Sequence, residues 1–150
     1  MVDVFDREKR SDVMSRIRSS GTRIELRLYE MVRALLGGRW RIDQNDRALP
    51  GAPDVVVPSL RLVILADGCF YHCCPKHGRV PDSNRAYWEP KLAGNVRRDR
   101  AHRRALRALG FSVWRFWEHD LEYRGLARTY AVLERRLAKR VLESRGATGG

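Results

Sequence analysis

The sequence has no apolar run long enough to cross a membrane, and its first residues, MVDVFDREKR, lack the apolar core of a signal peptide. We therefore expect a cytoplasmic protein that does not associate with a membrane. Cysteine is also scarce, because the chain has three, at positions 69, 73 and 74. Cysteines this close together cannot form a paired disulfide framework, and a reducing compartment favours them as metal ligands.

Acidic residues are few in comparison with basic ones. The chain has 18 Asp and Glu against 30 Lys and Arg, which gives a net charge of +12. Such a charge attracts polyanions, and nucleic acid is the first candidate, although a solvated arginine-rich surface would have the same composition.

The length of 150 residues and the hydrophobic content of 43% indicate one folded domain and exclude a disordered basic tail. We expect this domain to span residues 1–143, with residues 1–20 forming an N-terminal helical arm. Residues 144–150 are expected to form a flexible tail.

Apolar periodicity predicts the order α-α-β-β-β-α-β-α, an α/β fold in which a mixed central sheet is flanked by helices. Ser11 begins the first helix and Gly21 ends it, and a capping box of Thr22 and Glu25 opens the second. Pro90 is expected in the first turn of a later helix. Strands are predicted at residues 40–44, 55–57, 62–65 and 112–117, and the other helices at residues 22–36, 88–109 and 126–141.

The strongest chemical pattern lies in residues 49–77, LPGAPDVVVPSLRLVILADGCFYHCCPKH. Cys69, Cys74 and His77 offer three ligands on one loop, and His119 could supply the fourth of a tetrahedral Cys2His2 zinc site. Zinc there would attach the loop to the sheet and contribute on the order of 10 kcal/mol. Cys73 is an alternative ligand to Cys74, and thiols without a metal are the alternative to the whole site.

Two polar residues remain beside this cluster. Asp54 stands at the head of the buried strand 55–57, where a carboxylate has no role in packing. His72 lies between the zinc ligands and either supports them or acts as the acid or base of a reaction centred on Asp54.

Separated motifs follow one another across residues 3–125: Asp3-Val4, Arg10-Ser11, Thr22-x-x-Glu25, Leu49-Pro50-Gly51-x-Pro53-Asp54, Asp67-Gly68-Cys69-Phe70-Tyr71-His72, Trp88, Asn95, Asp99, Gly110 and Trp117-Glu118-His119. In this order they resemble the very-short-patch mismatch repair endonucleases. Tyr71 stands where a tryptophan is usual in that family, and its ring is smaller but still aromatic.

The resemblance implies a restriction-endonuclease-like core with a structural zinc site. It also implies an enzyme that nicks DNA on the 5′ side of the thymine in a T:G mismatch, which arises when 5-methylcytosine is deaminated. The expected cofactor is catalytic Mg2+. The expected partners are a DNA duplex with a T:G mismatch and the mismatch-repair proteins with which the enzyme would cooperate. We expect a monomer, because one lesion on one strand has no two-fold symmetry.

The resemblance also assigns roles by position. Mg2+ is held by Asp54 and the backbone carbonyl of Ala66, His72 serves the attacking water, and Glu25 supports the site from the early helix. Asp67 stands where some members of the family carry a histidine, and we expect Asp67 or Glu25 to orient metal-bound waters. The zinc ligands are Cys69, Cys74, His77 and His119. The residues expected to contact DNA are Phe70, Tyr71, Trp88 and Asn95.

Simpler explanations exist for some of these residues. Capping alone would account for Glu25, and the aromatic residues could belong to the core, although Phe70 and Tyr71 are consecutive and would not both face it. A related nuclease with another specificity and a non-catalytic zinc-containing DNA-binding module are the rival functions. A catalytic zinc hydrolase is disfavoured because four protein ligands would close the zinc site to water.

Overall fold

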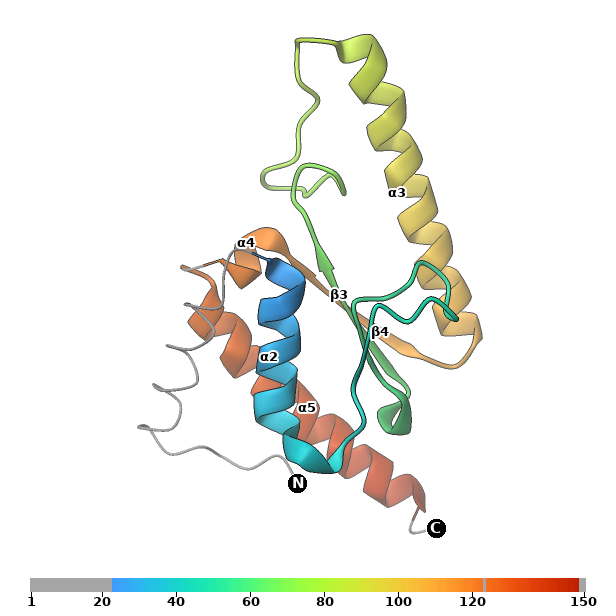
Figure 1. Ribbon diagram of the computed structural model, residues 1–150, viewed down its shortest axis with the longest axis vertical. Helices are drawn as coiled ribbons and strands as arrows, with labels where there is room; N and C mark the ends of the chain where they lie inside the picture. Colours follow the sequence, from blue (N-terminus) through green and yellow to red (C-terminus); the bar gives the residue numbers. More distant parts are fainter. Residues whose placement is uncertain (1–22, 123, 149–150) are drawn as a thin grey trace.

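The computed structural model describes residues 23–122 and 124–148, and it contains a four-stranded mixed sheet with helices on both faces (Figure 1). The helix predicted between Ser11 and Gly21, and with it the N-terminal arm, lies outside the described residues. Within the described residues, no helix combines the length and the apolar character needed to cross a membrane.

The sheet has the strand order β1-β2-β3-β4. Strand β1 (Asp43–Gln44) pairs antiparallel with β2 (Val55–Val57), and β2 pairs antiparallel with β3 (Leu62–Asp67). Strand β4 (Ser112–Trp117) runs parallel to β3, with Leu62 opposite Ser112 and Asp67 opposite Trp117. Because parallel strands need a crossover, the long helix α3 (Arg85–Ala108) connects β3 to β4.

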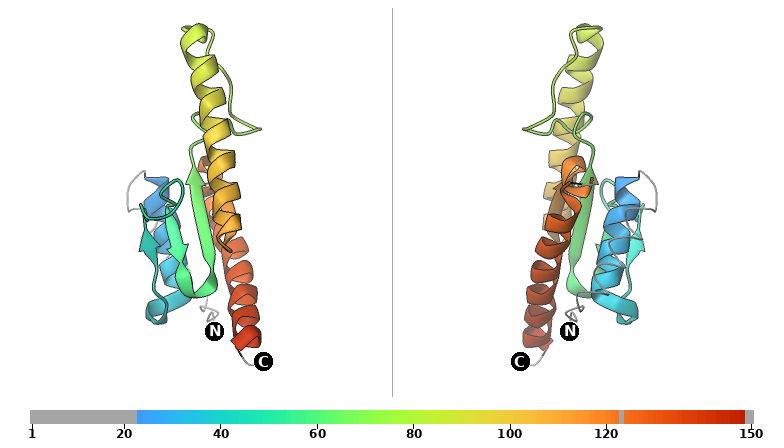
Figure 2. Two further views of the ribbon diagram at one scale, coloured as in Figure 1. Left: turned by 90° about the vertical axis from the view of Figure 1, so that its right-hand side faces the viewer. Right: turned by 90° about the vertical axis from the view of Figure 1, so that its left-hand side faces the viewer.

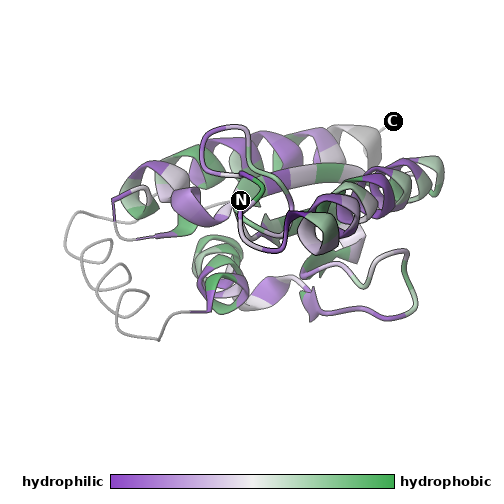
Figure 3. Cartoon of the chain, turned by 90° about the horizontal axis from the view of Figure 1, so that it is seen from above, coloured by the Kyte–Doolittle hydropathy of each residue, from purple (hydrophilic) through white to green (hydrophobic). Residues whose placement is uncertain are grey.

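The main hydrophobic core lies on one face of the sheet, under α2 (Ile24–Leu36) and α5 (Leu126–Thr148). Alternate residues of each strand point to this face, so Val55 and Val57 belong to this core while Val56 belongs to a second cluster on the other face. The helices show hydrophobic and hydrophilic residues in alternation along their length, as expected when one side is buried and the other is exposed (Figure 3).

The second face carries α3 and a smaller cluster built around Val56, Val63 and Leu106. A helix of 24 residues is about 36 Å long, almost twice the length of a six-residue strand. The first part of α3 therefore extends beyond the sheet together with the loop that follows β3 (Figures 1 and 2). This end of the molecule has little core and is available for binding.

Several predicted boundaries differ from the observed ones. Helix α2 has Arg23 as its N-cap and not Thr22, so its start differs from the predicted one by one residue. Thr22, the other member of the capping box predicted with Glu25, lies outside the described residues. Strand β1 is shorter than predicted because its partner β2 ends at Val57, where Pro58 begins a 3-10 helix (η2, Pro58–Leu60).

The ends of α3 and α5 also differ. Helix α3 begins at Arg85, so Pro90 is inside the helix and not in its first turn. In this first turn Nε of Arg85 lies 3.4 Å from Oε2 of Glu89, an ion pair between residues four apart. Pro90 is exposed, so water can satisfy the carbonyl that loses its partner. Helix α5 continues to Thr148, past the position where the tail was expected, and Arg140 and Glu143 form an ion pair near its end.

Candidate active site and metal centre

A cavity of about 190 Å3 opens where the sheet meets α3, and it is lined by groups that can carry charge. Strand alternation directs Asp54, Asp67 and Arg115 to the face that α3 covers. The charged or titratable lining residues are Glu25 from α2, Asp54, Asp67, His72, and Asp99, His102 and Arg103 from α3. Four residues with predicted catalytic roles therefore meet in one place.

Asp54 is a partly buried carboxylate of this cavity. Its Oδ2 accepts a hydrogen bond of 2.8 Å from the backbone N–H of Ala66, which fixes the group, and no described residue bonds Oδ1. The pKa of Asp54 is raised to about 6, chiefly by burial. The bond from Ala66 and the charge of His72 lower this pKa, and the nearby charges of Asp67 and Glu25 raise it.

Four carboxylates around one cavity provide hard oxygen donors, the chemistry that Mg2+ prefers. One oxygen of Asp54 has no partner among the described residues, and a cation beside it would favour the ionised form that burial and the charges of Asp67 and Glu25 disfavour. The donor set therefore fits Mg2+. The predicted role of Ala66 concerns its carbonyl, and the structure places this residue directly beside Asp54 through its N–H.

Asp99 fixes the ring of His72 through a hydrogen bond to one of its two nitrogens. Its Nδ1 lies 2.5 Å from Oδ2 of Asp99, and since an ionised carboxylate only accepts, Nδ1 carries the proton. The other nitrogen, Nε2, lies 3.9 Å from Oδ1 of Asp67, on the side of the cavity. This tautomer leaves Nε2 free to accept a proton.

Sequence reasoning gave no role to Asp99 and missed Arg115. Arg115 donates from Nε to Oδ2 of Asp67 at 2.5 Å, its Nη2 is 3.9 Å from Oδ2 of Asp99, and its guanidinium stacks 4.0 Å from the Trp117 ring centroid. One arginine thus holds both acids that flank His72. The available signal was a charged residue in the middle of the apolar strand SVWRFW.

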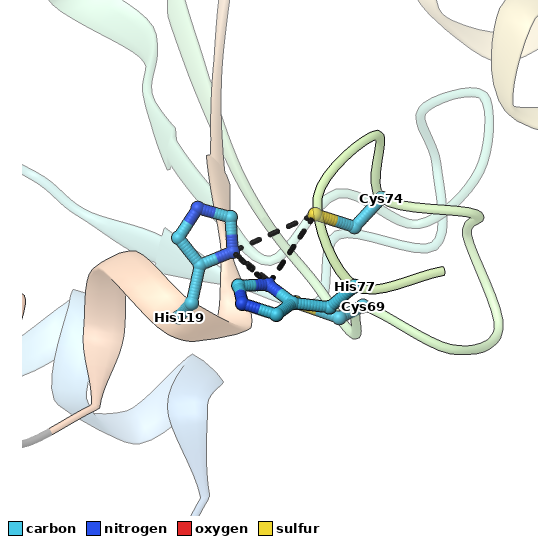
Figure 4. Close-up of side chains that lie close together, drawn as sticks. All are labelled: Cys69, Cys74, His77 and His119. Atoms are coloured by element: carbon cyan, nitrogen blue, oxygen red, sulfur yellow. Dashed lines mark hydrogen bonds between the residues drawn. The ribbon is translucent and has the colours of Figure 1, made fainter. Parts of the chain in front are cut away.

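Cys69, Cys74, His77 and His119 form a compact cluster whose ligand atoms all lie within 4.8 Å of one another (Figure 4). The two Nδ1 atoms are 3.2 Å apart, and the distances from Sγ to Nδ1 range from 3.3 to 4.0 Å. A tetrahedral zinc with ordinary bond lengths requires about 3.4 Å between nitrogens and about 3.6 Å between sulfur and nitrogen. The four residues therefore fit a zinc ion.

The structure distinguishes between the two adjacent cysteines. Cys74 lies in the cluster and is buried, whereas Cys73 has φ 57° and its Sγ lies 4.0 Å from the carbonyl of Leu92. Nε2 of His119 lies 3.6 Å from Asp120, a carboxylate behind a ligating histidine as in many zinc sites. Burial raises the pKa of the Cys69 thiol to about 11, so a bound cation would be needed to keep it ionised.

An aromatic cluster lies on the part of the molecule that extends beyond the sheet. The rings of Phe70, Tyr71 and Trp88 have centroids 5.0 to 6.4 Å apart, and Tyr87 packs on Trp88. Tyr71 is 53% exposed, so this cluster is not part of the core. Asn95 donates from its side chain to the carbonyl of Tyr71 at 3.0 Å and so fixes the loop on α3.

Comparison with known proteins shows the family to which the chain belongs. The family model described as DNA mismatch endonuclease Vsr matches residues 2–77. This chain belongs to the Vsr family. The resemblance found from the sequence is therefore confirmed, and the matched segment contains the Asp54 strand and three of the four Cys2His2 residues.

Individual relatives match most of the chain. The DNA mismatch endonuclease Vsr of Escherichia coli is 37% identical over 139 residues, which cover 90% of this chain and 85% of that protein. The type II nicking enzyme V.NaeI of Lentzea aerocolonigenes is 42% identical over 74% of this chain and 68% of its own length. The type II nicking enzyme V.XorIIP of Xanthomonas oryzae pv. oryzae is 38% identical over 81% of this chain and 88% of its own length.

Proposed function

We propose that this Vsr-family protein is a Mg2+-dependent endonuclease that nicks one DNA strand on the 5′ side of the thymine in a T:G mismatch. The nick would begin very-short-patch repair of deaminated 5-methylcytosine. The observation that carries the proposal is the cavity in which Asp54, Asp67, Glu25 and His72 meet, next to an exposed aromatic cluster. The names of the relatives, a mismatch endonuclease and nicking enzymes, support the same reaction class.

The chemistry follows from the charges in the cavity. Asp54 and the carbonyl of Ala66 would hold Mg2+, which supplies positive charge against the anionic phosphodiester when it is bound. Nε2 of His72 takes the proton of the water that attacks phosphorus, and the phosphorus–oxygen bond to the leaving strand end breaks. Asp99 keeps His72 in the tautomer that can accept this proton. Asp67 and Glu25 orient water in the cavity.

Recognition of the mismatch would use the aromatic cluster. Tyr71 and its neighbours Phe70 and Trp88 would insert beside the mispaired bases, where unstacking costs less than at a matched step. Asn95 would contact DNA from the same surface while it holds the Tyr71 loop. A structural zinc at the Cys2His2 cluster would keep this loop rigid.

The architecture supports a restriction-endonuclease-like core, because the mixed sheet places Asp54 and Asp67 beside one another at one edge of a cavity. We propose that residues 1–143 act as a single endonuclease domain and that the protein binds its duplex as a monomer. Cooperation with mismatch-repair proteins belongs to the same proposal.

A nicking assay tests the proposed function directly. A strand-labelled duplex with one T:G mismatch in a methylation-site context is incubated with Mg2+ and run on a denaturing gel. A matched duplex and the Asp54→Ala variant are the controls. We expect one Mg2+-dependent cut just 5′ of the mispaired thymine, absent from both controls. Cutting of both strands or of the matched duplex would indicate a nuclease of another specificity, and binding without a cut would leave a DNA-binding module.

A further inference from the structure

Arg103 differs in position from the exposed arginines of α3. It lines the 190 Å3 cavity that holds Asp54, and it also lines a neighbouring cavity of about 150 Å3. His72 and Asp99 line both cavities as well, so Arg103 stands at the junction of the two beside the proposed proton acceptor. By contrast, Arg104 and Arg107 are exposed and line neither.

One nitrogen of the Arg103 guanidinium lacks a hydrogen-bond partner among the described residues. This nitrogen, Nη1, is buried. The nearby acids already have partners, because Asp99 bonds His72 and Asp67 bonds Arg115. Burial, followed by the charge of Arg115, lowers the pKa of Arg103, and the charges of Asp99 and Asp67 offset this only in part.

An unpartnered buried N–H of a charged group costs free energy that a bound anion would recover. A guanidinium donates in a planar fork that matches the oxygens of a phosphate. The ligand expected in a cavity shared with Asp54 and His72 is the phosphodiester that is cut. Charge develops on the non-bridging oxygens of that phosphate during the reaction, and a fixed donor there lowers the barrier.

We propose that Arg103 binds a non-bridging oxygen of the scissile phosphodiester and stabilises the charge that develops on it. This inference rests on the proposed nicking activity for the identity of the phosphate. It assigns Arg103 a function different from that of the exposed arginines of α3, which can provide only sequence-neutral attraction to DNA.

The kinetic test compares Arg103→Gln and Arg103→Lys with Arg104→Gln, which removes the same charge from the next position. Nicking of the T:G duplex is measured in single turnover with Mg2+ and saturating enzyme. We expect Arg103→Gln to nick about 100-fold more slowly once bound, Arg103→Lys to recover part of the rate, and Arg104→Gln to stay within about twofold of the wild type. Zinc content and melting temperature identify any variant that has not folded. A well-folded Arg103→Gln protein that nicks at the wild-type rate would overturn the assignment.

A binding test separates this inference from the nicking activity itself. Affinity is measured without Mg2+ for the T:G duplex and for the same duplex with an uncharged methylphosphonate at the linkage 5′ of the thymine. The wild type and Arg104→Gln should lose about tenfold in affinity on this replacement, and Arg103→Gln should lose almost none. If the wild type does not nick but this coupling is present, the proposed function fails, whereas the contact of Arg103 with the phosphate 5′ of the thymine stands. An equal loss for all three proteins would contradict the role of Arg103.

Discussion

At the scale of single residues, a group proposed for catalysis also lowers the stability of the fold. Asp54 is a half-buried carboxylate whose pKa is raised to about 6, chiefly by burial, and the charges of Asp67 and Glu25 oppose its ionisation. A carboxyl group whose pKa is higher in the folded than in the unfolded chain destabilises the fold once the pH rises above its unfolded value. Asp54, the proposed catalytic carboxylate, therefore lowers the free energy of unfolding of the Mg2+-free protein.

Asp54→Asn should abolish nicking and stabilise the Mg2+-free protein. The penalty of Asp54 is absent below about pH 4, grows as the pH rises to about 6, and is complete above it, where a shift of about two units corresponds to about 3 kcal/mol. We expect the variant to gain about 1–3 kcal/mol at pH 7.5, and to lose more than about 1,000-fold in nicking rate.

Urea unfolding of both proteins between pH 5 and 8, with zinc bound and without chelator, measures this gain. Loss of zinc at lower pH affects both proteins and cancels in the difference. A variant that is less stable than the wild type at pH 7.5 would contradict the electrostatic explanation.

At the scale of elements, the loop after β3 has little core of its own and is held at two places. The Cys2His2 cluster connects it to the short helix α4 (Glu118–Leu121), which carries His119 (Figure 4). Asn95 of α3 holds its other side through the carbonyl of Tyr71. The loop is thus fixed between the helix after β4 and the helix before it, and the aromatic cluster stands on this support.

The adjacent cysteines provide a matched test of the metal centre. Cys74→Ser should lose bound zinc and destabilise the protein by several kcal/mol, because its Sγ is one of the four ligand atoms. Cys73→Ser should keep its zinc, since Cys73 contacts Leu92 instead. A colorimetric zinc assay and thermal unfolding measure both effects. Zinc loss in the Cys73 variant with retention in the Cys74 variant would reverse the assignment.

The exposed ring of Tyr71 allows a test of the aromatic cluster without a large effect on stability. Tyr71→Ala should reduce the preference for a T:G duplex over a matched one by about tenfold, because a stacked ring contributes about 1–3 kcal/mol. Tyr71→Phe keeps the ring and should bind like the wild type. Fluorescence anisotropy with both duplexes gives the ratio, and an unchanged ratio for the alanine variant would remove Tyr71 from mismatch recognition.

At the scale of the whole molecule, the two faces of the sheet have different tasks. Helices α2 and α5 enclose the main core on one face, and α3 lines the proposed catalytic cavity on the other. The first part of α3 protrudes beyond the sheet (Figure 2). The net charge of +12 favours DNA binding, but it does not show where the duplex lies. The position of the cavity predicts the α3 face.

Removal of three charges from each face tests this orientation. Combined substitution of Arg97, Arg100 and Arg107 with Gln should reduce the salt dependence of duplex affinity, with the slope of log K against log salt falling by about two to three. Substitution of Arg128, Arg135 and Lys139 of α5 removes the same charge and should leave the slope nearly unchanged. Titrations between about 50 and 200 mM salt measure both slopes. Equal effects from the two faces would argue against a binding face on α3.

The sequence by itself determined the features that depend on near neighbours. The apolar runs around Pro58 predict β2 and β3, and the glycines at 37 and 110 end helices as expected, because positive φ costs glycine little. The spacing of Cys69, Cys74 and His77 indicated a metal site before any fold was known. The family motifs identified Asp54 and His72 as candidates, and both line one cavity.

Only the tertiary structure decided which distant residues meet. Arg115 bonds Asp67 because β4 lies parallel to β3 in one register, and Asp99 and Arg103 reach the cavity because α3 crosses that face of the sheet. The backbone conformation of Cys73, not its spacing, keeps it out of the metal cluster. Local patterns report which residues are buried, whereas charge pairs in a cavity depend on the pairing of strands and the crossing of helices far apart in the chain.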